Sequence, residues 1–153
     1  MMQKRILIAL GIFYGICLAV LTGCAGTDWA TISDMKQIAA MREEVSKPNL
    51  TFTDVLIIRM NTETGSRLEV TSIAPSVVSA QKNGAPAAKT TFALTAKRDI
   101  LVLFTQDVTH WKAFRKEIPV TQLTPGKTFR FPVVQESGEI QQQTFTVDKI
   151  ITQ

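Results

Sequence analysis

Residues 100–115 read ILVLFTQDVTHWKAFR, and this stretch decides the fold class. Its first five residues are all apolar, so a strand built from them is apolar on both faces. We therefore expect residues 100–106 to form a central strand that is covered on both sides. A polar bend follows this strand, and beyond it Trp111 and Phe114 stand among basic residues.

Further strands are expected on both sides of this segment. Short runs rich in Val, Ile, Thr and Phe are separated by turn residues at intervals of about ten, which is typical of a β-sandwich. The expected strands cover residues 50–60, 67–73, 76–80, 89–96, 100–106, 117–122, 127–135 and 140–151. Residues 61–65, 82–86, 124–127 and 136–139 are rich in turn residues, and residues 81–89 are interpreted as a mobile loop.

Two of these strands indicate which side chains are buried. Residues 128–133 alternate between apolar and polar, which predicts one wet face. Pro132 favours the edge of a sheet, because proline has no N–H to donate to a neighbouring strand. In the last strand Phe145 and Val147 alternate with polar residues, so we expect both to point inward.

A short helix is expected before the strands, over residues 32–47. Its apolar residues recur at spacings of three and four, as one face of a helix requires: Ile32, Met35, Ile38, Ala39, Met41 and Val45. Pro48 ends the pattern, and Asp28 or Ser33 is a candidate N-cap. The helix either packs on the domain or binds a partner or a membrane surface. The predicted fold is mainly β: a small, antiparallel, immunoglobulin-like β-sandwich over residues 49–153, preceded by this helix.

The N-terminal segment has the features of an export signal. Lys4 and Arg5 precede an uncharged run at residues 6–20, ILIALGIFYGICLAV, which is shorter than the roughly 20 residues of an ordinary transmembrane helix. The next four residues, Leu21-Thr22-Gly23-Cys24, resemble the lipobox of bacterial lipoproteins. A retained anchor helix, or a conventional signal cut near Ala25, is the alternative interpretation.

The lipobox resemblance implies that residues 1–23 are removed and that Cys24 carries a diacylglycerol and an N-acyl chain such as palmitate. Residues 24–31 would then be a lipidated tether that holds the domain on a membrane. In lipoproteins of this kind an Asp after the Cys marks retention in the inner membrane. Ala25 stands there, so the resemblance implies the outer membrane, with the domain facing the periplasm.

Removal of the signal changes the charge balance of the chain. The full sequence has 17 basic and 13 acidic residues, and without Lys4 and Arg5 the mature chain is close to neutral. No basic run remains that would follow a phosphate backbone, so we expect no nucleic-acid partner. Cys17 leaves with the signal and Cys24 is modified, so no disulfide, thiolate nucleophile or cysteine metal site is expected.

No catalytic constellation is visible in the sequence. His110 is the sole histidine, and no nucleophile motif accompanies it. One isolated histidine does not provide a metal site, and Asp99 and Asp107 are as readily turn residues as ligands. We therefore expect no enzyme activity, no metal and no cofactor apart from the lipid on Cys24.

The better functional candidate is the segment 107–115 as a binding surface. It carries His110, Trp111, Lys112, Phe114 and Arg115, and aromatic and arginine side chains are enriched at binding hot spots. Loops on a rigid scaffold often carry binding residues. The alternative is that Trp111 and Phe114 plug one end of the sandwich.

The lipobox, together with the run ILVLFTQDVTHWKAF, resembles the outer-membrane lipoproteins of type VI secretion systems. In both, an apolar strand is followed by a polar bend and a Trp next to a basic residue, and a terminal alternating strand over residues 144–150 also fits. The resemblance implies a transthyretin-like sandwich that binds the periplasmic end of an inner-membrane core protein. A lipid-tethered ligand-binding or inhibitor module, with residues 81–89 as part of a pocket, is the alternative function.

Overall fold

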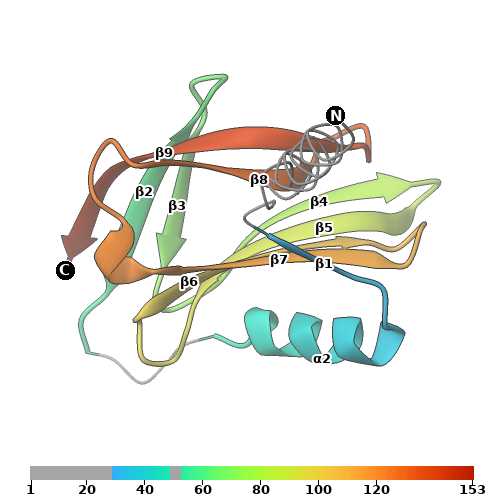
Figure 1. Ribbon diagram of the computed structural model, residues 1–153, viewed down its shortest axis with the longest axis horizontal. Helices are drawn as coiled ribbons and strands as arrows, with labels where there is room; N and C mark the ends of the chain where they lie inside the picture. Colours follow the sequence, from blue (N-terminus) through green and yellow to red (C-terminus); the bar gives the residue numbers. More distant parts are fainter. Residues whose placement is uncertain (1–28, 49–52) are drawn as a thin grey trace, which may run out of the picture.

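A computed structural model describes residues 29–48 and 53–153, and in these residues the chain is mainly β, with two antiparallel sheets and one α-helix (Figure 1). One sheet has five strands in the order β1-β7-β6-β5-β4, and the other has four in the order β3-β2-β9-β8. The predicted small β-sandwich preceded by a helix is therefore confirmed. The elements are β1 Ala30–Ile32, α2 Met35–Ser46, β2 Leu56–Thr62, β3 Arg67–Thr71, β4 Ser76–Lys82, β5 Ala85–Leu94, β6 Ile100–Asp107, β7 Lys112–Pro119, a 3-10 helix Val120–Gln122, β8 Thr128–Val134 and β9 Ile140–Thr152.

Strand β6 lies in the middle of the five-stranded sheet and is buried on both faces, as its apolar run predicts. Leu101 and Leu103 belong to the main core between the two sheets. Val102 and Phe104 face the opposite way and pack in the cluster beneath α2. The expected inward side chains of β9 are also buried in the main core, since Phe145 and Val147 are each 1% exposed.

Helix α2 covers the outer face of the five-stranded sheet, on the side away from the second sheet (Figure 1). Ile38 and Val45 are its buried residues and pack on that face. The cap is Asp34, whose Oδ1 accepts hydrogen bonds from the backbone N–H groups of Lys36 and Gln37 at 2.8 and 3.2 Å, so the expectation of Ser33 is wrong. The other expected cap, Asp28, lies outside the described residues.

Two expectations about the N-terminal part need correction. The helix begins at Met35, not at residue 32, and the end of the expected tether over residues 24–31 belongs to the fold. Ala30–Ile32 pairs antiparallel with β7 as strand β1, opposite Arg115, Phe114 and Ala113. The physical reason is that an edge strand of a neighbouring sheet offers hydrogen bonds to any extended segment that passes it, whatever its own sequence pattern.

Two expected boundaries in the sheets are also wrong. Residues 81–89 are not a loop, because β4 and β5 form a hairpin whose turn is Asn83-Gly84, with φ of 55° and 81°. Residues 117–122 are not a strand by themselves, because β7 already begins at Lys112 and a 3-10 helix follows it. In both places a tight turn returns the chain to the sheet earlier than the hydrophobic pattern indicates.

Buried threonines join the two sheets at strand β8. The Thr105 hydroxyl donates to the Pro132 carbonyl at 2.5 Å, and the Val134 N–H donates to the Thr90 hydroxyl at 3.0 Å. The two hydroxyl oxygens lie 3.1 Å apart. β8 is an edge strand, as Pro132 predicts, but its end is covered by the opposing sheet.

Candidate partner-binding surface

The turn between β6 and β7 is built on Asp107. Its Oδ1 accepts hydrogen bonds from the backbone N–H groups of Thr109 and His110 at 3.0 and 3.1 Å, which is a common way for Asp to close a turn. Its Oδ2 lies 2.7 Å from Nδ1 of His110, whose side chain is 70% exposed. The carboxylate therefore orients the imidazole at the surface of the turn.

Trp111 ends this turn in an unusual backbone conformation. Its φ is 52°, in the left-handed region, which is rare for a bulky residue and costs free energy relative to glycine or asparagine. Its side chain is one of the large apolar ones left at the surface, with 50% exposed. Because folding alone does not favour a tryptophan here, Trp111 is a functional candidate.

Phe114 lies on the other side of the hairpin. It is half-buried against the main core, and its ring meets that of Trp29 edge to face with centroids 4.8 Å apart. Together with the β8–β9 hairpin these rings border a shallow hollow of about 360 Å³. The described residues around it are Trp29, Asp107, His110, Lys112, Phe114, Pro132, Ile140 and Gln142.

Arg115 is part of an ion-pair cluster beneath α2. Its Nη2 lies 3.1 Å from Oε1 of Glu44 on the helix and 2.7 Å from Oε1 of Glu117 on the same strand. Burial by itself disfavours the charged guanidinium, but the hydrogen bonds that it donates to Glu44 and Glu117 outweigh this effect, so the pKa of Arg115 is raised above its usual value. With 14% of its side chain exposed, Arg115 ties the helix to β7 within this chain.

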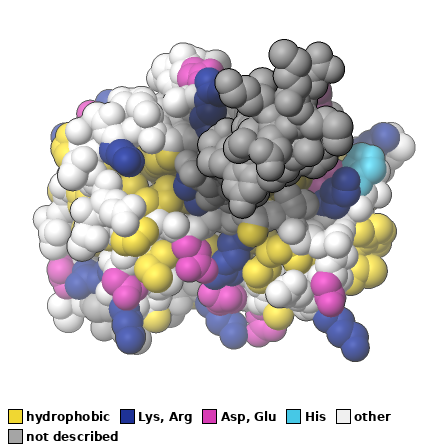
Figure 2. Space-filling model, viewed as in Figure 1, with side chains coloured by type: hydrophobic (Ala, Val, Ile, Leu, Met, Phe, Trp, Pro, Cys, Tyr) yellow, Lys and Arg dark blue, Asp and Glu magenta, His cyan; other side chains and the backbone are white. Residues whose placement is uncertain are grey.

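Two adjoining hollows lie on the outer face of the five-stranded sheet, beside α2. Their volumes are about 540 and 460 Å³, and both are bordered by Arg42, Lys89 and Gln106. Trp111 borders the first hollow, whereas Val77 and Ser79 of β4 border the second. On the side of the molecule where α2 lies, apolar side chains stand beside charges of both signs (Figure 2).

The side chains that border these hollows are cationic, amide and apolar. Within the described residues neither Arg42 nor Lys89 has a carboxylate in ion-pair distance. Gln106 is 7% exposed and directs its side chain to both hollows. Two cations and an amide beside exposed Trp111 and Val77 suit a ligand that has both carboxylate and apolar groups.

The five residues predicted for partner binding therefore do not form one patch. Trp111 borders the outer hollow, the side chains of His110, Lys112 and Phe114 border the hollow near β8, and Arg115 is engaged with the helix. Sequence reasoning missed Arg42, Lys89 and Gln106, which come from α2, β5 and β6. Their only signal along the chain is that Lys89 and Gln106 are polar residues within apolar strands.

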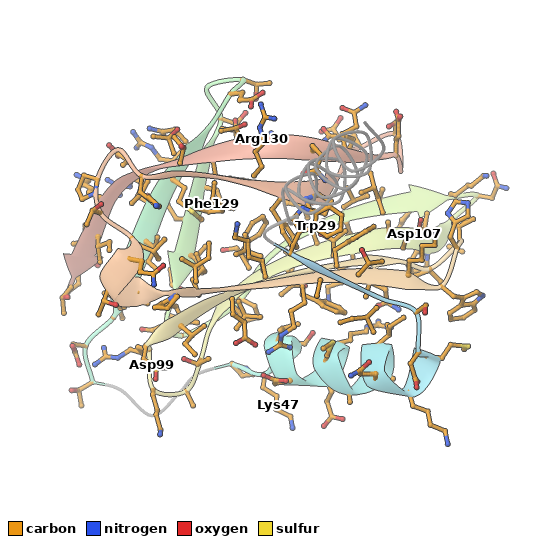
Figure 3. The ribbon with its side chains drawn as sticks, viewed as in Figure 1. Trp29, Lys47, Asp99, Asp107, Phe129 and Arg130 are labelled. Atoms are coloured by element: carbon orange, nitrogen blue, oxygen red, sulfur yellow. The ribbon has the colours of Figure 1, made fainter. Side chains whose placement is uncertain are left out.

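The two aspartates considered as metal ligands are turn residues at opposite ends of β6 (Figure 3). Asp99 accepts a hydrogen bond from the Thr95 hydroxyl at 2.6 Å, which holds the pKa of its carboxyl below the usual range. The nearby Asp54 has its pKa lowered in the same way, by a hydrogen bond from Arg98. Across the described ranges, no three His, Cys, Asp or Glu side chains are grouped to hold a metal ion.

Comparison with known proteins finds no matching protein family, no matching protein of curated function and no matching solved structure. In the part of the chain that the structure describes, no helix has the length and apolar character to cross a membrane. The molecule thus presents a small β-sandwich with an exposed hairpin tip and a hollowed, partly cationic face.

Proposed function

We propose that this chain is a lipid-anchored, non-enzymatic component of a bacterial envelope complex. The observation that carries the proposal is the sequence Leu21-Thr22-Gly23-Cys24 directly after a 15-residue uncharged run at residues 6–20. Acyl chains on Cys24 would hold the sandwich at the membrane, since each buried methylene contributes about 0.8 kcal/mol. The exposed, conformationally costly Trp111 supports a role in contacting a partner.

The position of Trp29 limits how far the folded domain can lie from a lipid on Cys24. Trp29 already packs on Phe114, so only four residues, 25–28, separate the lipid site at Cys24 from the fold. The five residue-to-residue steps from Cys24 to Trp29 span at most about 18 Å even when fully extended. A domain anchored through Cys24 would therefore stay close to the bilayer, with its β1 side nearest to the lipid.

Within this class we propose the outer-membrane lipoprotein of a type VI secretion system, facing the periplasm. The resemblance that supports it lies in the lipobox and in the apolar strand, polar bend and Trp-basic pair at residues 100–112. The partner would then be the periplasmic end of the inner-membrane core protein of that system. The domain would act as a fixed point at the outer membrane on which this partner is held.

Lipidation is tested by metabolic labelling of cells that express the full chain with a palmitate analogue. The two cysteines provide a matched pair of variants. Cys24→Ser should abolish the label and release the protein from the membrane fraction, whereas Cys17→Ser should keep the label and remain in the membrane fraction. Labelling that survives in Cys24→Ser would refute the anchor.

The assembly role is tested by photo-crosslinking in the same cells, with the photoreactive residue at position 111 on the hairpin tip or at position 130 on β8. We expect one discrete adduct from at least one position, containing the periplasmic end of the inner-membrane core protein. The Cys24→Ser chain should fail to form it, since the released domain loses its position at the membrane. Smears or no adducts from both positions would refute the assembly role.

One observation favours a second function, a lipid-tethered ligand-binding or inhibitor module. Gln81, Pro86 and Lys89, which belong to the segment 81–89, border the hollow of about 460 Å³ beside β4. A thermal-shift screen of the purified chain with carboxylate-bearing small molecules tests this function. A ligand whose stabilising effect is lost in Lys89→Glu, but kept in the exposed control Lys97→Glu, would support it over the assembly role.

A further inference from the structure

Four strands lie at the edges of the two sheets, and three of them carry features that oppose pairing with another strand. β1 has three residues only. β8 contains Pro132, and its end is bonded to the opposing sheet. On β3 the Glu69 carbonyl already accepts a hydrogen bond from the Ser76 hydroxyl. The remaining edge is β4.

The backbone of β4 directs two residues away from the sheet. On β5, Thr95 and Ala87 bond toward β6, because the Thr95 N–H donates to Ile100 and the Ala87 carbonyl accepts from Val108. Alternate residues of an antiparallel strand bond to opposite neighbours, so Ala88, Thr90 and Phe92 bond toward β4. Their partners are Ala80, Val78 and Ser76, which leaves Val77 and Ser79 directed outward.

This outward edge is open and uncharged. Within the described residues, no backbone hydrogen bond to Val77 or Ser79 is formed outside the β4–β5 ladder. The stretch Ser76 to Ala80 contains no proline and no charged residue, and the bulge in the ladder comes only after Ala80. Val77 is 45% exposed. An uncharged edge of this kind is a template for a further strand.

We propose that an extended segment of a partner protein adds to β4 as a strand and directs a carboxylate toward Arg42 and Lys89. The inference rests on the proposed function, because it names the chemistry of the partner that the anchored domain would hold. Val77 and Ser79 supply the backbone bonds. Their side chains border the same hollow as the two cations, so alternate residues of an added strand would lie over that hollow.

The charges select this occupant over a second copy of the chain. Two copies paired through β4 would bring Arg42 and Lys89 of both to the same face, and like charges placed together oppose association. A partner segment with a glutamate or aspartate on that face instead neutralises two cations that have no ion pair among the described residues.

The position of β4 agrees with the proposed anchor. β1, next to the tether, and β4 are the opposite edges of one sheet. Four strand spacings of about 4.8 Å place them roughly 19 Å apart. The edge that accepts the partner strand is therefore the one farthest from the lipid within that sheet.

The experiment uses the full chain, purified in detergent micelles, and a nine-residue strand-forming peptide with two glutamates on one face. Its twin carries two lysines at the same positions. Peptide binding is measured by fluorescence anisotropy, and hydrogen exchange follows the amides of Val77 and Ser79. We expect the glutamate peptide to bind about tenfold more tightly than the lysine peptide and to slow exchange at both amides.

Matched variants separate the backbone from the charge contribution. Ser79→Pro removes one outward N–H without touching the β5 ladder and should weaken binding about tenfold, whereas Ser79→Thr should not. Lys89→Glu should weaken binding of the glutamate peptide about threefold, and Lys97→Glu, in an exposed turn at the other end of the sheet, should have no effect.

Three results would overturn the inference: equal binding of both peptides, unchanged binding by Ser79→Pro, or dimerisation of the chain that Ser79→Pro abolishes. The measurement needs no secretion system and no membrane, so its outcome does not depend on whether the chain is lipid-anchored. If Cys24 is not lipidated but β4 binds the acidic strand, the proposed function is wrong and the binding edge stands. If Cys24 is lipidated and β4 binds neither peptide, only the edge inference is wrong.

Discussion

Strands β8 and β4 are both seven-residue edge strands, yet they differ in whether their outward backbone groups have hydrogen-bond partners. On β8 the outward carbonyl of Pro132 and N–H of Val134 bond to threonine hydroxyls of the opposing sheet. On β4 the outward groups of Val77 and Ser79 have no such partner among the described residues. A sandwich can thus close one edge with side chains from across the core and leave the other edge open.

The largest expected effect comes from placing proline on each edge. Val134→Pro removes a buried N–H that bonds to Thr90 and should lower the free energy of unfolding by about 3 kcal/mol. Ser79→Pro removes an outward N–H and should lower the free energy of unfolding by less than about 1 kcal/mol. Urea unfolding of the two variants measures the difference. Equal losses would mean that the two edges do not differ.

The hydroxyls that close β8 are tested by the double variant Thr90→Val with Thr105→Val. It keeps the shape of both side chains but leaves the Pro132 carbonyl and the Val134 N–H without their partners, so we expect the free energy of unfolding to fall by about 2 kcal/mol. Ser79→Val, the same kind of change on β4, should alter stability by less than about 0.5 kcal/mol. Unfolding midpoints in urea compare the two, and a neutral double variant would contradict this account of β8.

A smaller effect is expected where α2 covers the sheet. Arg115→Met keeps much of the side-chain length but removes the bonds to Glu44 and Glu117, whose side chains are 59% and 48% exposed and can be hydrated. We expect a loss of about 1 kcal/mol, and the difference from the native chain should shrink in 1 M salt. A loss that does not respond to salt would mean that Arg115 acts through packing instead.

The smallest change in stability is expected at the hairpin tip beside the open face. Trp111→Gly relieves the left-handed backbone at φ 52° and should leave the free energy of unfolding unchanged or raise it by up to about 1 kcal/mol. The melting temperature should accordingly stay the same or rise. Trp29→Ala, which loses the contact with Phe114, should lower the melting temperature. A clear loss of stability in Trp111→Gly would indicate that this tryptophan is retained for folding.

Much of the fold was predictable because it depends on short-range patterns. The apolar run of β6 required cover on both faces, and it has the second sheet on one side and α2 on the other. Pro132 indicated an edge because proline lacks the N–H that a central strand uses. The strand β1 was missed, because three residues without a pattern of their own pair only when β7 is already in place.

The candidate surface was only partly predictable for the same reason. The mixture of aromatic and basic residues drew attention to segment 107–115, but the turn at Asp107 separates its side chains onto two faces of the hairpin. Arg42, Lys89 and Gln106 lie far apart along the chain, and only the packing of α2 on the sheet places them around the same hollows.

By itself the sequence determined the class of fold and the central strand, since both depend on neighbouring residues and on their alternation or spacing. The tertiary structure alone decided which edge is closed and which is open. That difference depends on hydrogen bonds between the hydroxyls of Thr90 and Thr105 and backbone groups of β8. The bonded residues are separated by 44 and 27 positions in the chain, respectively. No local sequence pattern predicts these hydrogen bonds, because they form only once the two sheets have packed together.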